Sequence, residues 1–302
     1  MLRVGVRLTA EMKRIFYTLV FGVALSVGMK AQAAESVAER LLSEKRPLVI
    51  GHRGYSMVAP ENTMVAFEFA IAAGADLVEL DYYHAKDGVP VVIHDGTLDR
   101  TTDATNRFGA NKIKIESKTA KEITSLNAGS WFNPRYSNEK PPLLNDALDF
   151  IQKKGVTLIE RKAGDAKTCV EMLREKNLVN ALIVQAFDWQ YLADFHAIEP
   201  KQVLGALGPP STKDGKRLSD EEKKLSSAWI DEAQKTGARA VVWSRSVDKA
   251  AIDYAHSKGL KVWVYTINES QLANQMLDAG VDGIITDNPA LIWKTIALRP
   301  KK

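Results

Sequence analysis

A regular alternation between two kinds of segment is the feature that most constrains how this chain folds. From residue 34 onward, short apolar runs end abruptly in polar residues, and stretches of helical periodicity follow most of them. This alternation predicts a parallel β-sheet whose strands are connected by helices. The strand-like runs are 48–51, 77–81, 90–94, 156–160, 181–186, 203–207, 238–243, 261–267 and 283–286, and the helical candidates are 63–73, 144–154, 167–176, 189–196, 221–236, 247–258 and 270–279.

The number of these units favours an α/β fold of the closed (β/α)8 type, a TIM-type barrel. Nine strand-like runs compete for eight barrel positions, however. Residues 82–89, between the second and third runs, are too few for a parallel crossover, which needs about a dozen residues or more. We therefore expect a hairpin-like extension at this point. Residues 96–142 show little periodicity, and we predict that they form an insertion lying over one face of the barrel.

The N-terminus has the pattern of a secretory signal peptide. Lys13 and Arg14 precede an uncharged apolar run at 15–29, and Ala31-Gln32-Ala33 is a small-residue cleavage site. The run is shorter than the roughly 20 residues that a membrane-spanning helix needs, so cleavage is favoured over anchoring. We predict a cleaved signal peptide at 1–33, a barrel domain at 34–302, and export to the periplasm or the medium. Met12 stands just before the basic pair and is an alternative start to Met1.

The charge balance bears on the possible partners, and the cysteine count bears on disulfide bonds. Of the 41 basic and 37 acidic residues, five basic and one acidic lie in 1–33, which leaves 36 of each in the rest. A balanced domain of this kind does not indicate nucleic acid as a partner. We also expect no stable membrane insertion once the signal peptide is removed. The single cysteine, Cys169, excludes an intramolecular disulfide.

Polar residues close several of the apolar runs. Because the active sites of such barrels lie at the C-terminal ends of the strands, these residues should meet in one place. Burying so many ionisable groups together is costly unless they bind something. They are His52 and Arg53, Glu79 and Asp81, His94 and Asp95, Glu160 and Lys162, and Gln185 with Asp188.

Three of these residues are candidates for a metal site. Glu79 and Asp81 are two positions apart, so on a strand both side chains face the same side. Glu160 ends another strand and can supply a third carboxylate. Three hard oxygen ligands suit Mg²⁺ or Ca²⁺ and are poor for zinc. We therefore expect one divalent cation, Ca²⁺ or Mg²⁺, as the cofactor.

The remaining polar groups suit phosphate chemistry. His52 and His94 each follow an apolar run, and two imidazoles at one site suit a general base and a general acid near neutral pH. Arg53 offers a bidentate fork and Lys162 a point charge, so both fit as phosphate-binding cations.

A longer set of motifs resembles the glycerophosphodiester phosphodiesterase family. The resemblance begins at His52 and extends over nearly all of the chain after the signal peptide. It rests on His52-Arg53-Gly54, Ala59-Pro60-Glu61-Asn62-Thr63, Gly74-Ala75-Asp76, Glu79-Leu80-Asp81, Lys86-Asp87-Gly88, Leu98-x-Arg100-Thr101-Thr102, Gly129-Ser130-Trp131-Phe132, Glu160-x-Lys162, Gln185-x-Phe187-Asp188, Trp263-x-Tyr265-Thr266-x-Asn268 and the block from Gly280 to Pro289.

The resemblance implies an eight-stranded α/β barrel that hydrolyses a glycerophosphodiester to an alcohol and sn-glycerol 3-phosphate. The family's paired histidines fall on His52 and His94, its metal carboxylates on Glu79, Asp81 and Glu160, and its phosphate-binding cations on Arg53 and Lys162. Glu61 is expected either to orient neighbouring site groups or to complement the dipole of the following helix. Two positions depart from the family pattern, Arg161 and Ala186, and strand alternation turns Arg161 away from the site.

Aromatic residues near the strand ends are candidates for an apolar wall beside the glycerol. We assign Phe187 and Trp263 to substrate binding, and Tyr265, two positions after Trp263, is a further candidate for this wall. Trp243 fits this wall and the ordinary barrel core equally well.

Several alternatives stay open at this stage. The nucleophile is either water or the glycerol 2-hydroxyl, which would form a cyclic phosphate, and either histidine can be the base. A related enzyme acting on lysophospholipids in the manner of a lysophospholipase D is one rival function. A non-catalytic surface binding module is a second, and the intact charged cluster argues against it. A nonspecific phosphodiesterase acting on small esters is a third.

Overall fold

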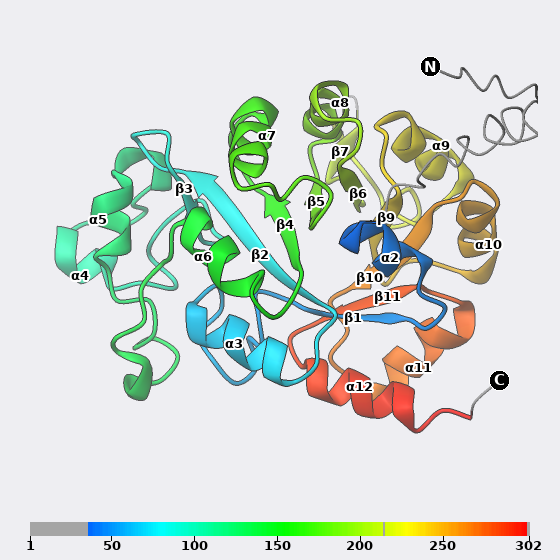
Figure 1. Ribbon diagram of the computed structural model, residues 1–302, viewed down its shortest axis with the longest axis horizontal. Coiled ribbons are helices and arrows are strands. Elements are labelled where there is room, and N and C mark those ends of the chain that lie inside the picture. The colour runs from blue at the N-terminus through cyan, green and yellow to red at the C-terminus, as the bar shows by residue number, and fades with distance from the viewer. Residues whose placement is uncertain (1–35, 214, 301–302) are drawn as a thin grey trace, which may run out of the picture. The chain divides into compact units, whose positions relative to one another are not determined.

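The computed structural model describes residues 36–213 and 215–300, and the predicted signal peptide lies outside these residues. Eight parallel strands form a closed barrel, which confirms the predicted (β/α)8 fold (Figure 1). The ring closes because β1 pairs with the last strand on one side, through Ile50 and Ile285, and with the second on the other, through Ile50 and Leu77. The barrel strands are β1 (Leu48–Gly51), β2 (Leu77–His84), β4 (Thr157–Arg161), β5 (Ile183–Ala186), β6 (Val203–Gly208), β9 (Ala240–Ser244), β10 (Lys261–Tyr265) and β11 (Gly283–Thr286).

The ninth strand-like run is the expected hairpin extension. Strand β3 (Pro90–Val92) pairs antiparallel with the end of β2, where Tyr83 lies opposite Val91. Strand β2 is longer than the sequence predicted, and its last residues leave the barrel to form this hairpin. The short link therefore makes an antiparallel turn, as its length required.

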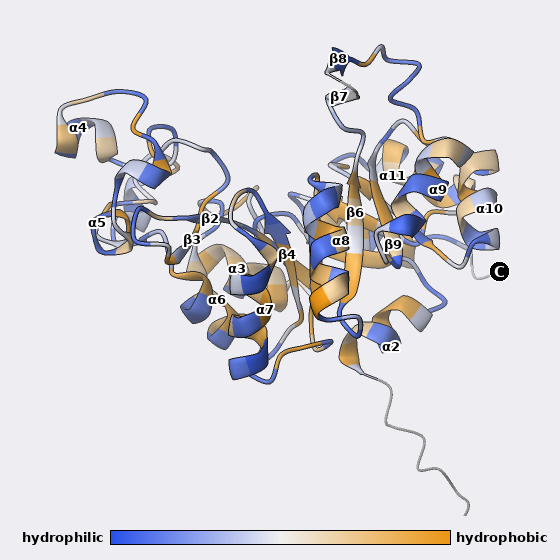
Figure 2. Cartoon of the chain, turned by 90° about the horizontal axis from the view of Figure 1, so that it is seen from above, coloured by the Kyte–Doolittle hydropathy of each residue, from blue (hydrophilic) through white to orange (hydrophobic). Residues whose placement is uncertain are grey.

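The predicted insertion at 96–142 is present, and it contains short helices and a small core of its own that the sequence did not predict. It holds α4 (Ala104–Phe108), α5 (Ala120–Thr124) and 3-10 turns at Ile115–Ser117 and Pro134–Tyr136. Helices of one turn are too short to show a helical period in the sequence. Buried insertion side chains such as Ile123 pack against Val91 and Ile93 of the hairpin, so the insertion is built on the β2–β3 extension (Figures 1 and 2).

Helices surround the strands, and most of them begin at a polar cap. The caps Thr63, Asp165, Asp188, Ser226, Asp248 and Asn288 each accept a hydrogen bond from the backbone N–H three residues on. The surrounding helices are α3 (Met64–Ala72), α6 (Leu144–Ile151), α7 (Ala166–Glu175), α8 (Trp189–Ile198), α9 (Ser227–Lys235), α10 (Lys249–Ser257), α11 (Ser270–Ala279) and α12 (Pro289–Ala297). The sequence did not predict α12 or the N-terminal helix α2 (Val37–Ser43).

Strand alternation divides the apolar side chains between two cores. Inward residues such as Ile50, Leu158 and Trp263 fill the barrel, together with Ala38 and Leu42 of α2. Outward residues of the same strands pack under the helices. In Figure 2 the strands are accordingly the most hydrophobic part of the barrel. A small hairpin, β7 (Thr212–Lys213) and β8 (Lys216–Arg217), follows β6. Among the residues described, no helix has the length and apolar character to span a membrane.

Trp243 belongs to the outer core, which settles its two sequence interpretations. Its side chain is fully buried, its ring centroid lies 6.0 Å from that of Trp229 and 6.4 Å from that of Trp189, and its Nε1–H donates to Lys223 O. Truncation would leave a large cavity and an unsatisfied carbonyl.

We predict that Trp243→Ala lowers the free energy of unfolding by about 3–5 kcal/mol because the helix layer cannot collapse into the space. Denaturant titration followed by circular dichroism measures this. The control is Leu298→Ala, whose side chain is 75% exposed and should change stability by less than about 0.5 kcal/mol. Equal effects in the two variants would contradict the assignment of Trp243 to the core.

Candidate active site

A cavity of about 190 Å³ opens at the C-terminal ends of the barrel strands. It brings together seven of the predicted site residues, while Asp81 lies fully buried beside it. One half of the cavity is charged and is built from β1, β2, β4 and the residues after β3. The other half is mostly apolar and is built from β5, β6, β10 and β11. The lining residues are His52, Arg53, Glu79, His94, Glu160, Lys162, Gln185, Phe187, Leu207, Tyr265, Thr266 and Ile285.

Glu79, Asp81 and Glu160 form the predicted carboxylate cluster. Alternation on β2 turns Glu79 and Asp81 inward while Leu80 packs in the outer core. Glu160 on β4 pairs in register with Asp81. Ligand atoms of the three side chains lie within 4.8 Å of one another, and all three residues are buried. The structure therefore confirms the convergence that strand spacing predicted.

The cluster fits a hard divalent cation. Glu79 Oε2 accepts from Arg53 N–H at 2.7 Å, whereas the buried Glu79 Oε1 has no hydrogen-bond partner among the described residues. Burial, with Asp81 and Glu160 close by, raises the pKa of Glu79 well above its ordinary value. Buried carboxylates this close repel one another, so they need positive charge between or beside them. All three contribute oxygen, which suits Ca²⁺ or Mg²⁺.

Arg53 and Lys162 supply two positive charges at the cluster. Lys162 Nζ lies 3.0 Å from Asp81 Oδ1 and also contacts Glu160 Oε1. Burial alone would lower the pKa of Lys162, but the surrounding carboxylates raise it above its ordinary value, so it stays protonated. Arg53 Nη1 donates to Glu61 Oε1 at 2.8 Å. Its buried Nε makes no hydrogen bond within the described part of the chain and lies 3.5 Å from Asp81 Oδ2 as an ion pair.

The turn after β1, which carries His52 and Arg53, depends on Gly54. Its φ is +85°, and a Cβ there would lie 2.5 Å from the backbone carbonyl carbon of Ala66. Glycine lets α3 pack directly on the turn and satisfies the left-handed backbone. Arg53 also has a positive φ, of 56°, so Arg53 and Gly54 together make a tight left-handed turn. His52 and Arg53 both line the cavity.

His52 is held by an aspartate from the far end of the chain. Its Nδ1 lies 2.6 Å from Asp287 Oδ1. Asp287 also accepts from Ser56 Oγ and Asn268 Nδ2. Burial alone would raise the pKa of Asp287, but these hydrogen bonds and the charge of a protonated His52 lower it to about 2. Sequence reasoning missed Asp287 as a partner; its one signal was a polar residue directly after the run 283–286.

His94 ends a chain of charged groups that starts at Arg53. Its Nδ1 lies 2.7 Å from Asp95 Oδ1, and Asp95 accepts two hydrogen bonds from Arg100. Arg100 in turn donates twice to Glu61, which also accepts from Arg53. Arg100 holds the pKa of Asp95 far below its usual range, and burial lowers the pKa of His94. Glu61 therefore orients site groups, which confirms the first of its two interpretations.

The apolar half confirms Phe187 as a lining residue but not Trp263. The Phe187 and Tyr265 rings meet edge to face at 6.2 Å between centroids, and both line the cavity. Trp263 is fully buried inside the barrel and packs on Gly283, so its assignment to substrate binding is corrected. Trp263 and Tyr265 face the same way on β10, but Trp263 lies one layer deeper.

Two further residues lie outside the site. Arg161 turns away as predicted: it donates to Gly164 O and Asp188 Oδ2, and its guanidinium stacks over Tyr191. Asp188 had been grouped with the site residues, and this is wrong. It caps α8 and binds Arg161, because a polar residue after a strand can equally begin the next helix.

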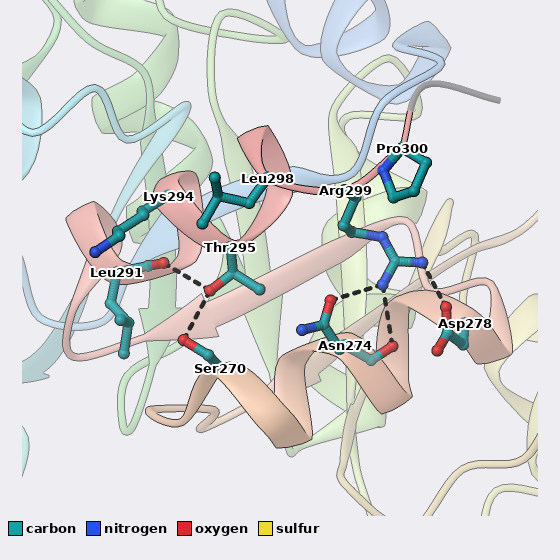
Figure 3. Close-up of a pocket in the computed structure, with 9 residues that line it drawn as sticks. All are labelled: Ser270, Asn274, Asp278, Leu291, Lys294, Thr295, Leu298, Arg299 and Pro300. Atoms are coloured by element: carbon teal, nitrogen blue, oxygen red, sulfur yellow. Dashed lines mark hydrogen bonds and ion pairs between the residues drawn. The ribbon is translucent and has the colours of Figure 1, made fainter.

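A second hollow, of about 380 Å³, lies between α11 and α12 (Figure 3). Its polar side chains bind one another: Thr295 Oγ1 donates to Ser270 Oγ, and Arg299 binds Asn274 and Asp278. No cluster of convergent carboxylates or imidazoles among the described residues faces it. The chemistry therefore lies at the strand ends.

The fold and site define a (β/α)8-barrel enzyme with two carboxylate-bound imidazoles beside an oxygen-ligand cluster. A profile of the glycerophosphoryl diester phosphodiesterase family matches residues 52–291. A glycerophosphodiester phosphodiesterase of Bacillus subtilis is 29% identical over 300 residues, covering 93% of this chain and 97% of its own. One from Caldanaerobacter subterraneus is 30% identical over 251 residues, covering 81% and 95%.

A solved structure is similar as well. It is an Oleispira antarctica phosphodiesterase in complex with the product sn-glycerol 3-phosphate, with a TM-score of 0.72 and 27% identity, covering 83% of this chain and 97% of that one. The present chain belongs to the glycerophosphoryl diester phosphodiesterase family. It is accordingly an enzyme, a phosphoric diester hydrolase.

We predict that Asp287 makes stability depend on pH on the acid side. Its pKa is about 2 in the folded protein against roughly 3.9 unfolded. Because the folded value is the lower one, this contribution is present above pH ~4 and is lost as the pH falls toward 2. Since the side chain is 29% exposed, screening reduces the contribution to roughly 1–2 kcal/mol.

The measurement compares Asp287→Asn with the parent by urea denaturation at pH 3, 4 and 5. The stability difference should be largest at pH 5 and shrink toward pH 3. Asp220→Asn, which alters a fully exposed carboxylate, should show no such trend. A difference that is the same at all three pH values would contradict the prediction.

Proposed function

We propose that this enzyme hydrolyses glycerophosphodiesters to an alcohol and sn-glycerol 3-phosphate in a cation-dependent reaction. The observation that carries the proposal is the division of the cavity into a charged half and an apolar half. A phosphodiester with a small organic arm has the same division. The relative from Oleispira antarctica, which binds sn-glycerol 3-phosphate, supports the choice of product.

Glu79, Asp81 and Glu160 would hold the cation, Ca²⁺ or Mg²⁺, which when bound would supply Lewis-acid stabilisation of charge on the phosphate oxygens. Arg53 and Lys162 bring fixed positive charge to the same half of the cavity. The Nε–H of Arg53, which lies 3.5 Å from Asp81 Oδ2 and makes no hydrogen bond to a described residue, can donate to a phosphate oxygen while Nη1 keeps its bond to Glu61.

His52 and His94 move the protons. One deprotonates the nucleophile, and the other protonates the departing alcohol. Asp287 and Asp95 each bind an Nδ1, so each ring has a fixed orientation and a carboxylate that stabilises its protonated form. The nucleophile is water or the glycerol 2-hydroxyl, and the second route passes through a cyclic phosphate.

We also propose that the enzyme is exported after removal of residues 1–33. The basic pair, apolar run and Ala-x-Ala site support this. Sequencing the N-terminus of protein expressed with its leader in a bacterial host should give Ala34.

We predict that the purified enzyme releases glycerol 3-phosphate from glycerophosphocholine and that EDTA abolishes the release. Ca²⁺ or Mg²⁺ should restore it. Glu79→Gln should lower kcat/KM by 100-fold or more because a ligand charge is lost. The control is Asp76→Asn, at the opposite end of β2, where Asp76 binds Arg46.

The assay distinguishes the proposed reaction from its alternatives. Release that resists EDTA would remove the cation from the proposal, and release of choline phosphate would mean that the other ester bond is cleaved. Faster turnover of lysophosphatidylcholine than of glycerophosphocholine would favour the lysophospholipase alternative.

We predict that His52→Ala and His94→Ala each lower kcat on glycerophosphocholine by roughly 10²–10⁴-fold. With a glycerol phosphodiester of p-nitrophenol, the variant lacking the general acid should recover much of its rate, because p-nitrophenolate leaves without a proton. Recovery by one variant alone assigns the acid, and equal recovery or none in both would contradict separate roles. His256→Ala, which alters a histidine paired with Asp282, is the control.

A further inference from the structure

Gln185 is a buried polar residue of the cavity that the mechanism above does not use. Gln185 lies on β5, is 1% exposed and lines the cavity. Its Oε1 has no hydrogen-bond partner among the described residues. A buried carbonyl left without a donor destabilises a fold, and such groups are explained when a ligand completes them.

Gln185 lies at the edge of the carboxylate cluster, on the side away from β2. In register, Gln185 pairs with Glu160 on one side and with Gly205 on the other. Because the strand order is β2–β4–β5–β6, it lies on the far side of Glu160 from Asp81. The three carboxylates come from β2 and β4 alone. Gln185 thus lies next to Glu160, at the border between the charged half and the apolar half of the cavity.

Gly205 leaves room beside Gln185. A Cβ at Gly205 would lie 3.4 Å from Gln185 Cβ, 4.0 Å from its Oε1 and 3.2 Å from Val242 Cγ2. A larger residue would fill the space next to the amide. Glycine therefore keeps this flank of the amide open.

Other polar groups in this half are less suited to bind a ligand. The Tyr265 hydroxyl donates to Gly208 O at 2.7 Å and is held there. Phe187, Leu207 and Ile285 are apolar, and Thr266 is only half-buried. Gln185 Oε1 is therefore the buried acceptor that this wall offers to a substrate.

We propose that Gln185 Oε1 accepts a hydrogen bond from a hydroxyl of the substrate's glycerol and so places the glycerol in the apolar half. The amide oxygen can only accept, so its partner must be a donor. Phosphodiester oxygens and a choline group carry no donor, whereas glycerol carries two hydroxyls. The inference rests on the proposed function and extends it to substrate orientation.

The test measures direct binding, with sn-glycerol 3-phosphate and n-propyl phosphate as a pair that differs by two hydroxyls. Isothermal titration calorimetry with Mg²⁺ present gives Kd for each ligand with the parent and with Gln185→Met, which has a similar volume but no amide. The parent should bind glycerol 3-phosphate about 3–10-fold more tightly per hydrogen bond formed, and the variant should lose that preference. Val184→Ala, an outward-facing change on the same strand, should keep it.

Three results would overturn the inference. The first is an unchanged preference in Gln185→Met, and the second is a parent that binds both ligands equally or binds neither. The third is a tenfold loss of affinity for Mg²⁺ or Ca²⁺ alone in Gln185→Met, which would place Gln185 among the cation ligands. Failure to hydrolyse glycerophosphocholine would overturn the proposed function. The comparison of Kd values would still test the role of Gln185, because it is measured without turnover.

Discussion

Three carboxylates confined within 4.8 Å of one another in a buried site are the constraint on which the rest of this active site depends. Such a cluster is unfavourable by itself, since burial and the charge of Asp81 raise the pKa of both Glu79 and Glu160. The charges of Arg53 and Lys162 offset part of this repulsion, and Glu79 Oε1, which no described residue hydrogen-bonds, fits a further cation. The barrel makes the arrangement possible because parallel strands bring residues from distant segments to one end.

The two histidines are positioned by partners of different origin. His52 is bound by Asp287, which follows the last barrel strand, so closure of the barrel creates this pair. His94 is bound by Asp95, and behind this pair Arg100 of the insertion binds both Asp95 and Glu61 of the β1–α3 loop. The insertion is therefore more than a cover, because it contributes a charged chain that runs back to Arg53. A change in its packing should therefore reach both His94 and Arg53.

The division of the cavity connects electrostatics with substrate choice. Charged groups from β1, β2, β4 and the residues after β3 form one half, while Phe187, Leu207 and Tyr265 form much of the other. A low-dielectric wall beside the charged half strengthens the interactions made there. Gln185, beside Glu160 at the border of the apolar half, is a directional contact through which one hydrogen bond distinguishes ligands with and without a hydroxyl.

By itself, the sequence determined the barrel, the β2–β3 hairpin and the convergence of the carboxylates with His52, His94, Arg53 and Lys162. These follow from local rules: strand period, loop length and the shared end of parallel strands. Only the tertiary structure decided which side chains the site residues bind and how deeply each one is buried in the barrel. Asp287 and His52 are 235 positions apart, Trp263 lies one layer below Tyr265, and Asp188 serves its own helix. Such contacts depend on barrel closure and stagger, which no local pattern of residues encodes.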